Sequence, residues 1–92
     1  MIWTIEYHTL VQKQVKKLDP QTRNRIRSFL HERLAQLDNP RKIGEVLQGS
    51  ELGNYWRYRT GDYRILCDIQ DNKLVVLVIE IGHLPKKAIA EP

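Results

Sequence analysis

The sequence has few of the residues on which several chemistries depend. Cys67 is the single cysteine, so no intrachain disulfide can form, and its place in an apolar segment indicates an inert core thiol. The three histidines are dispersed without metal-ligand spacing, and the glycines lack the lysine-serine ending of a phosphate-binding loop. Ser28 is expected in a helix and Ser50 in a loop, which does not support serine catalysis. We therefore expect no metal and no small-molecule cofactor.

Long apolar runs are also absent. No stretch approaches the roughly 18 residues of a membrane-spanning helix, and the N-terminus lacks the features of a secretory signal. A hydrophobic fraction of 41% and a charged fraction of 28% are typical of a soluble globular protein. Without a linker, repeat or charge block, the sequence predicts a single domain over residues 1–92, located in the cytoplasm and with no membrane contact.

The net charge of the chain is +4 at pH 7. Such a charge suggests attraction to nucleic acid or to an acidic protein. Many ordinary small proteins are equally basic, so charge alone does not choose between these partners.

Periodicity predicts a strand and two helices in the first part of the chain. Residues 2–7 alternate apolar and polar side chains, as a half-buried strand does. Thr9 and Gln12 have the spacing of a capping box ahead of a short amphipathic helix. Asp19 is a good N-cap for a second helix over residues 20–37, which opens on a proline.

Three strands are predicted in the second part, after a loop at residues 40–54. They cover residues 55–60, 63–70 and 73–81, and the last of them is apolar on both faces, as an interior strand is. The simplest architecture that buries these stripes is an α+β fold in the order β-α-α-β-β-β. Its two N-terminal helices pack on one face of a mostly antiparallel four-stranded sheet.

The segment at residues 55–64 alternates aromatic and arginine residues through a turn. If Gly61 and Asp62 form a two-residue loop, Arg59 lies directly opposite Arg64, and Arg57 shares their face. Arginines on a sheet surface are usually only solvated, but like charges placed opposite one another favour an anion site. A three-residue loop would shift the register and separate them.

The same alternation assigns the other strand residues to two faces. The residues expected to face the helices are Trp56, Tyr58, Ile65, Cys67, Ile69, Val76 and Val78. The residues expected on the other face are Arg57, Arg59, Arg64, Leu66, Asp68, Leu77 and Ile79. That mixture of arginines and aliphatic side chains indicates a cleft or a partner surface.

These features together resemble the RelE/ParE superfamily of bacterial toxin-antitoxin toxins, and within it the RelE-like branch. The resemblance covers nearly the whole chain, and the hairpin at residues 55–64 is its most specific part. The short helices and compact middle loop resemble the RNA-cleaving branch more than the gyrase-directed one. The other matching motifs are Leu18-Asp19-Pro20, Leu37-Asp38-Asn39-Pro40 and Ile81-Gly82-His83.

This resemblance implies a microbial RNase-like RelE fold and a ribosome-dependent endoribonuclease that cuts mRNA in the A site. Its expected partners are the ribosome, mRNA and a cognate antitoxin that holds it inactive. In this family a ribose 2′-hydroxyl is the nucleophile, and basic side chains offset the charge on the phosphate. The expected catalytic residues are Arg57, Arg64 and His83, with His83 as proton carrier; the expected RNA-binding residues are Arg59, Tyr63, Lys86 and Lys87.

The chain departs from the family after Gly82-His83. RelE-like toxins usually continue with an arginine and then a tyrosine, whereas Leu84 follows here and no tyrosine does. Loss of one transition-state contact typically costs ~10²- to 10³-fold in rate. Two alternatives to mRNA cleavage therefore stay open, a gyrase-inhibiting toxin and a catalytically inactive relative that binds an antitoxin.

Overall fold

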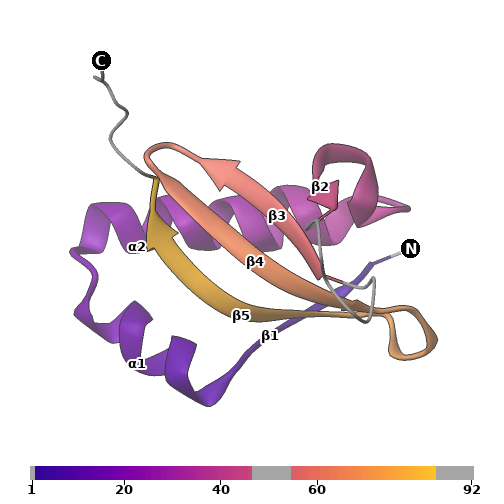
Figure 1. Cartoon of the computed structure of the whole chain (residues 1–92), viewed down its shortest axis with the longest axis horizontal. Coiled ribbons are helices and arrows are strands. Elements are labelled where there is room, and N and C mark those ends of the chain that lie inside the picture. Colours follow the sequence, from indigo (N-terminus) through magenta and orange to yellow (C-terminus); the bar gives the residue numbers. More distant parts are fainter. Residues whose placement is uncertain (1, 47–54, 85–92) are drawn as a thin grey trace.

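The computed structural model describes residues 2–46 and 55–84, which form a helical hairpin and a five-stranded sheet (Figure 1). The strands are β1 (Thr4–Tyr7), β2 (Glu45–Val46), β3 (Tyr55–Thr60), β4 (Tyr63–Gln70) and β5 (Val75–His83). The helices are α1 (Thr9–Lys17) and α2 (Pro20–Ser28), and the short turns are η1 (Phe29–Arg33), η2 (Leu34–Gln36), η3 (Pro40–Ile43) and η4 (Asp71–Lys73). The predicted α+β class is confirmed.

The strand order is β1-β5-β4-β3-β2, with β1 parallel to β5 and every other pair antiparallel. β5 lies inside the sheet, as its apolar faces predicted. The predicted count of four strands was wrong, because β2 lies in the segment expected to be a loop. Two residues are too short to show a period of two, so sequence alternation could not reveal this strand.

The helices begin where polar side chains cap them. Asp19 Oδ2 accepts a hydrogen bond from the Thr22 backbone N–H at 3.1 Å, as predicted for the start of α2. For α1 the cap is His8, not Thr9, and its Nδ1 accepts from the Leu10 N–H at 3.2 Å. α2 continues through a π-helical turn, η1, and a 3₁₀ turn, η2. No helix in the described part of the chain is both long and apolar enough to cross a membrane.

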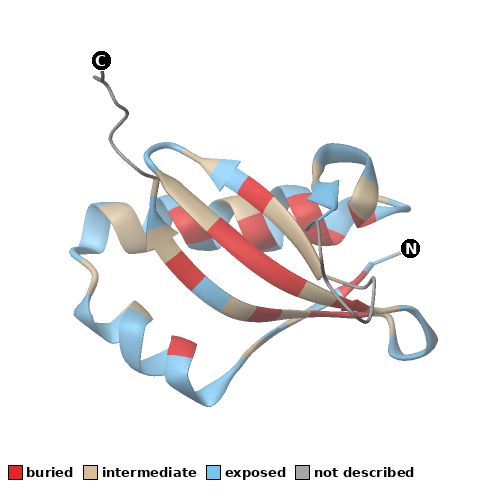
Figure 2. Ribbon diagram, in the orientation of Figure 1, coloured by how far each residue is buried: buried red, intermediate tan, exposed pale blue. Residues whose placement is uncertain are grey.

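The hydrophobic core lies between the helices and one face of the sheet (Figure 2). The strand residues predicted to face the helices are buried, apart from Trp56, which is half-buried. Burial raises the pKa of the Cys67 thiol, which keeps it protonated and unreactive. The core residues are Trp3, Val11, Ile26, Leu30, Leu34, Ala35, Tyr58, Ile65, Cys67, Ile69, Val76, Val78 and Ile81.

The other face of the sheet, here called the open face, is turned toward the viewer in Figure 1, with α2 passing behind the sheet. The helical hairpin thus leaves this face uncovered. We call the opposite, core-packed face the helical face.

Candidate anion site on the open face

The β3–β4 hairpin has the predicted register. Arg59 pairs with Arg64 and Arg57 with Leu66, so the three arginines share the open face. The loop is Gly61-Asp62, and Gly61 has a φ of 60°. Glycine is needed here for this backbone conformation; a Cβ atom would also lie 2.6 Å from Arg25 Nη1, but that exposed side chain can move aside.

Two of the three guanidinium groups contact carboxylates from neighbouring strands. Arg57 Nη2 lies 2.7 Å from Glu45 Oε1, and its Nε donates to the same oxygen at 3.3 Å. Arg64 Nη2 lies 3.5 Å from Glu80 Oε2. Both pairs are at least partly solvent-exposed, so each contributes little to stability and a competing phosphate can replace the carboxylate.

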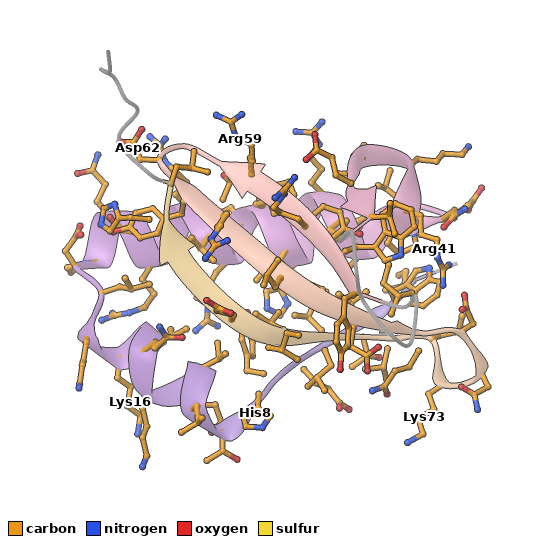
Figure 3. The ribbon with its side chains drawn as sticks, in the orientation of Figure 1. His8, Lys16, Arg41, Arg59, Asp62 and Lys73 are labelled. Atoms are coloured by element: carbon orange, nitrogen blue, oxygen red, sulfur yellow. The ribbon has the colours of Figure 1, made fainter. Side chains whose placement is uncertain are left out.

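Arg59 has no comparable partner. It makes no hydrogen bond or ion pair with any residue in the described ranges, and Figure 3 shows its side chain extending away from β3. Its full charge is therefore presented to solvent at the end of the hairpin. An anion that approaches the open face meets this cation without displacing a protein carboxylate.

Arg64 lies across β5 at Gly82, its partner in the sheet. An added Cβ on Gly82 would stand 3.8 Å from Arg64 Nε, which is ordinary contact. The Nε–H is buried and finds no acceptor among the described residues. Because this Nε–H is buried, a phosphate on the open face would meet the terminal Nη groups of Arg64, whose side chain is partly exposed.

Glu45 is brought to Arg57 by the segment that follows the helices. The buried Tyr58 hydroxyl donates to the Pro40 carbonyl at 2.8 Å. A Cβ on Gly44 would lie 2.7 Å from the Tyr58 ring, so the chain passes close over this tyrosine just before β2. β2 then pairs with β3 and places Glu45 opposite Arg57.

A β-bulge in β5 changes the faces of the residues after it. Leu66 pairs with Glu80, but the next residue, Cys67, pairs with Val78, which leaves Ile79 as the extra residue. From Glu80 onward the alternation is therefore inverted. Glu80 takes the open-face position beside Leu66 that uniform alternation had assigned to Ile79.

The bulge also turns His83 away from the open face, where its expected role as proton carrier would require it. His83 pairs with Tyr63, and both share the helical face with Ile65 and Ile81. The Tyr63 and His83 rings stack, with centroids 4.3 Å apart and planes tilted by 37°. Of the predicted site residues, the structure thus brings together Arg57, Arg59 and Arg64 and separates Tyr63 and His83 from them. Lys86 and Lys87 lie outside the described residues.

Sequence reasoning missed Glu45 and Glu80. Uniform alternation from Val76 and Val78 would have turned Glu80 toward the core, where an unpaired carboxylate is costly. A carboxylate at a predicted core position is thus a feature of the sequence that indicates the bulge. Glu45 gave no such signal, because it depends on a two-residue strand.

The chemistry of the open face is that of an anion site with nearby proton acceptors. Guanidinium groups give phosphate bidentate, permanently charged donors, and carboxylates can accept a proton from a hydroxyl. Within residues 2–46 and 55–84, no group of histidine, cysteine, aspartate and glutamate side chains could hold a metal ion.

Comparison with known proteins supports a toxin. The family model for the ParE toxin of type II toxin-antitoxin systems, parDE, matches residues 5–84. The chain therefore belongs to the RelE/ParE superfamily of toxin-antitoxin toxins. No significant match was found among curated proteins.

The chain is similar in structure to solved RelE toxins. The RelBE2 toxin-antitoxin complex of Mycobacterium tuberculosis matches with a TM-score of 0.79 and 25% identity, covering 91% of this chain and 93% of that one. The isolated RelE toxin of E. coli matches with a TM-score of 0.73 and 21% identity, covering 92% of this chain and 87% of that one. The archaeal RelE-RelB complex from Pyrococcus horikoshii matches with a TM-score of 0.70 and 21% identity, covering 95% of this chain and 100% of that one. The RelE-like fold is therefore shown.

Proposed function

We propose that this toxin is a ribosome-dependent endoribonuclease that cleaves mRNA in the A site and acts in the cytoplasm. The observation that carries the proposal is the shared placement of Arg57, Arg59 and Arg64 on a face that neither α1 nor α2 covers. The structural likeness to RelE toxins supports the same reading. A phosphodiester is the ligand that three clustered guanidinium groups fit best.

In the proposed reaction the ribose 2′-oxygen attacks the adjacent phosphorus, and the bond from phosphorus to the 5′-oxygen breaks. Arg57 and Arg64 offset the negative charge on the pentavalent phosphate, and Arg59 holds the strand. The 2′-hydroxyl proton must go to a base, and the departing 5′-oxygen takes up a proton from water, so that the products are a 2′,3′-cyclic phosphate and a 5′-hydroxyl. Glu45 and Glu80 are carboxylates on the open face, whereas His83 serves only if the RNA bends around the end of β5.

An antitoxin is the proposed protein partner. The RelE chains from Mycobacterium tuberculosis and Pyrococcus horikoshii were solved in complexes with their antitoxins. We propose that a cognate antitoxin places an acidic or amphipathic segment across the helices and the exposed sheet edge of this chain. Growth arrest on induced expression, relieved by co-expression of the adjacent open reading frame, tests this partnership.

Programmed ribosomes test the activity. Addition of the toxin should produce cuts in A-site codons that disappear with Arg64→Ala. Lys73→Ala is the matched control, because it removes a cation from the exposed turn η4. Cleavage that survives Arg64→Ala would remove the proposed site.

Gyrase inhibition is the second candidate, because the matching family model is that of the ParE toxin. In that case the protein would block DNA supercoiling and leave translated mRNA intact. A gyrase supercoiling assay, run beside the ribosome assay, separates the two functions.

A catalytically inactive relative is the third candidate, motivated by Leu84 and the missing tyrosine. Replacing Leu84 with arginine and adding an aromatic residue near the end should then raise toxicity. Unchanged toxicity would argue against this reading.

A further inference from the structure

The basic charge of the chain is concentrated in its helical hairpin. Residues 9–31 contain six lysines and arginines but a single acidic residue, Asp19, whereas the rest of the chain has nine basic and ten acidic residues. The arginines of the open face therefore do not account for the net positive charge. The excess of positive charge lies on the helical side of the molecule.

Two adjoining hollows mark this surface. The first, of about 240 Å³, is lined by Tyr7, Gln12, Val15, Lys16 and Arg27. The second, of about 290 Å³, is lined by Asn24, Arg27, Ser28, His31 and Glu32. Arg27 belongs to both, so it stands at the junction of one continuous surface. We call Tyr7, Lys16, Arg27 and His31 the helical-side site.

Arg27 is an uncommitted cation. It is exposed and makes no hydrogen bond or ion pair within the described part of the chain. Its charge contributes to lowering the pKa of His31, although desolvation is the larger cause, and it partly opposes the raised pKa of Tyr7. Arg27 lines the first hollow together with Tyr7 and the second together with His31, so it lies near both rings. Glu32 is the one carboxylate in the lining of either hollow.

Tyr7 and His31 form a linked ring pair beside these cations. The Tyr7 hydroxyl and His31 Nε2 are 2.7 Å apart, and the ring centroids are 5.9 Å apart with planes tilted by 35°. The hydrogen bond holds the end of β1 against η1. Aromatic rings next to arginine or lysine are the arrangement by which proteins hold an unpaired base and its phosphate.

We propose that the helical-side site binds one nucleotide of an RNA strand, with the phosphate on Arg27 and Lys16 and the base against the Tyr7–His31 ring pair. Lys16 extends from α1 into solvent, where it can reach a neighbouring phosphate (Figure 3). An acidic peptide would use the cations but would leave the rings without a stacking partner.

The proposal rests on the proposed function, since it assumes an RNA-directed toxin. The helical-side site and the three arginines lie on opposite sides of the sheet, so the nucleotide bound here differs from the one cleaved. For a toxin that works inside the ribosome, it would belong to the surrounding RNA. The site would hold the toxin in place while the open face acts.

Affinity for a short fluorescent single-stranded RNA with 2′-O-methyl riboses, which cannot be cleaved, tests the site. In an Arg64→Ala background, Arg27→Ala should weaken RNA binding about tenfold. The slope of log affinity against log salt concentration should fall by about one, which corresponds to the loss of one phosphate contact. Lys16→Ala should weaken RNA binding about threefold. Arg33→Ala, which removes the same charge outside both hollows, should change binding less than twofold.

Photocrosslinking locates the base. RNA that carries 4-thiouridine should crosslink to Tyr7 or His31, and Arg27→Ala should reduce the yield. Unchanged affinity in Arg27→Ala, or crosslinks confined to the open face, would overturn the proposal. The proposal would also be overturned if Arg27→Ala weakened the binding of a polyglutamate peptide but not of RNA. That result would favour an acidic protein as the ligand. Loss of mRNA cleavage on Arg64→Ala is scored separately, so either proposal can fail alone.

Discussion

The two faces of the sheet differ in what they offer a ligand. The open face presents three arginines with two exposed carboxylates, and the helical face presents ring pairs at the margins of a packed core. Strand alternation decides which residue reaches which face, and a bulge inverts it for the residues that follow. One bulged residue, Ile79, moved Glu80 to the arginines and His83 away from them. The faces assigned to strand residues from sequence are therefore correct only up to the first bulge in the strand.

The largest expected difference between the faces is in RNA cleavage. Arg64→Ala should reduce single-turnover cleavage on programmed ribosomes by ~10²- to 10³-fold, because it removes charge stabilisation at the phosphate. His83→Ala should reduce it less than about tenfold, since His83 lies on the helical face. Equal losses in the two variants would show that the substrate engages both faces.

The stability of the protein should be sensitive to substitution in the hairpin turn that aligns the arginines. Gly61→Ala should lower the free energy of unfolding by about 1–3 kcal/mol, because alanine at φ 60° is strained. Gly82→Ala is the matched control, with an expected change of about 0.5 kcal/mol or less. Urea denaturation of both variants measures the difference. Similar values would mean that the turn does not hold the register.

The carboxylate beside Arg64 should oppose RNA binding. Glu80→Gln removes a negative charge from the open face and frees the guanidinium, so affinity for an uncleavable RNA should rise about two- to fivefold. Asp71→Asn removes a negative charge at η4, paired with Arg41, and serves as the control. Fluorescence anisotropy compares the two. A fall in affinity for Glu80→Gln would indicate that Glu80 orients Arg64 for the RNA.

The smallest expected effect is a pH dependence on the helical side. Desolvation, followed by Arg27, lowers the pKa of His31 below its usual 6.5 in the folded protein. The unfolded chain therefore binds more protons, so stability should fall as the pH drops below 6.5 and level off under the folded pKa. The change should stay under about 0.5 kcal/mol, because solvent screens this exposed side chain.

Thermal denaturation across that pH range gives the measurement. His31→Gln should flatten this part of the profile. A profile that rises toward acid pH would contradict the sign of the shift.

The parts of the fold that local chemistry determines could be predicted. Asp19 starts α2 through a side-chain cap, and the Gly61-Asp62 loop sets the arginine register, so both are readable over a few residues. The inward-facing residues of β4 follow the same short-range logic.

The features that could not be predicted depend on contacts between distant segments. β2 exists because Tyr58 anchors the chain near Pro40 and lets Glu45 pair with β3. The bulge at Ile79 depends on how β5 fits β4. The helical-side site combines β1, both helices and η1, so no single stretch of sequence displays it.

The central claim is that Arg57, Arg59 and Arg64 together hold the RNA phosphate. Side-chain NMR of the arginine Nε–H groups tests it directly, during titration with an RNA that has a 2′-deoxy nucleotide at the cleavage position. The account predicts that the signals of these three arginines shift together and saturate at one RNA per protein, while that of Arg33 stays in place. Saturating RNA that leaves the three signals unmoved would contradict it.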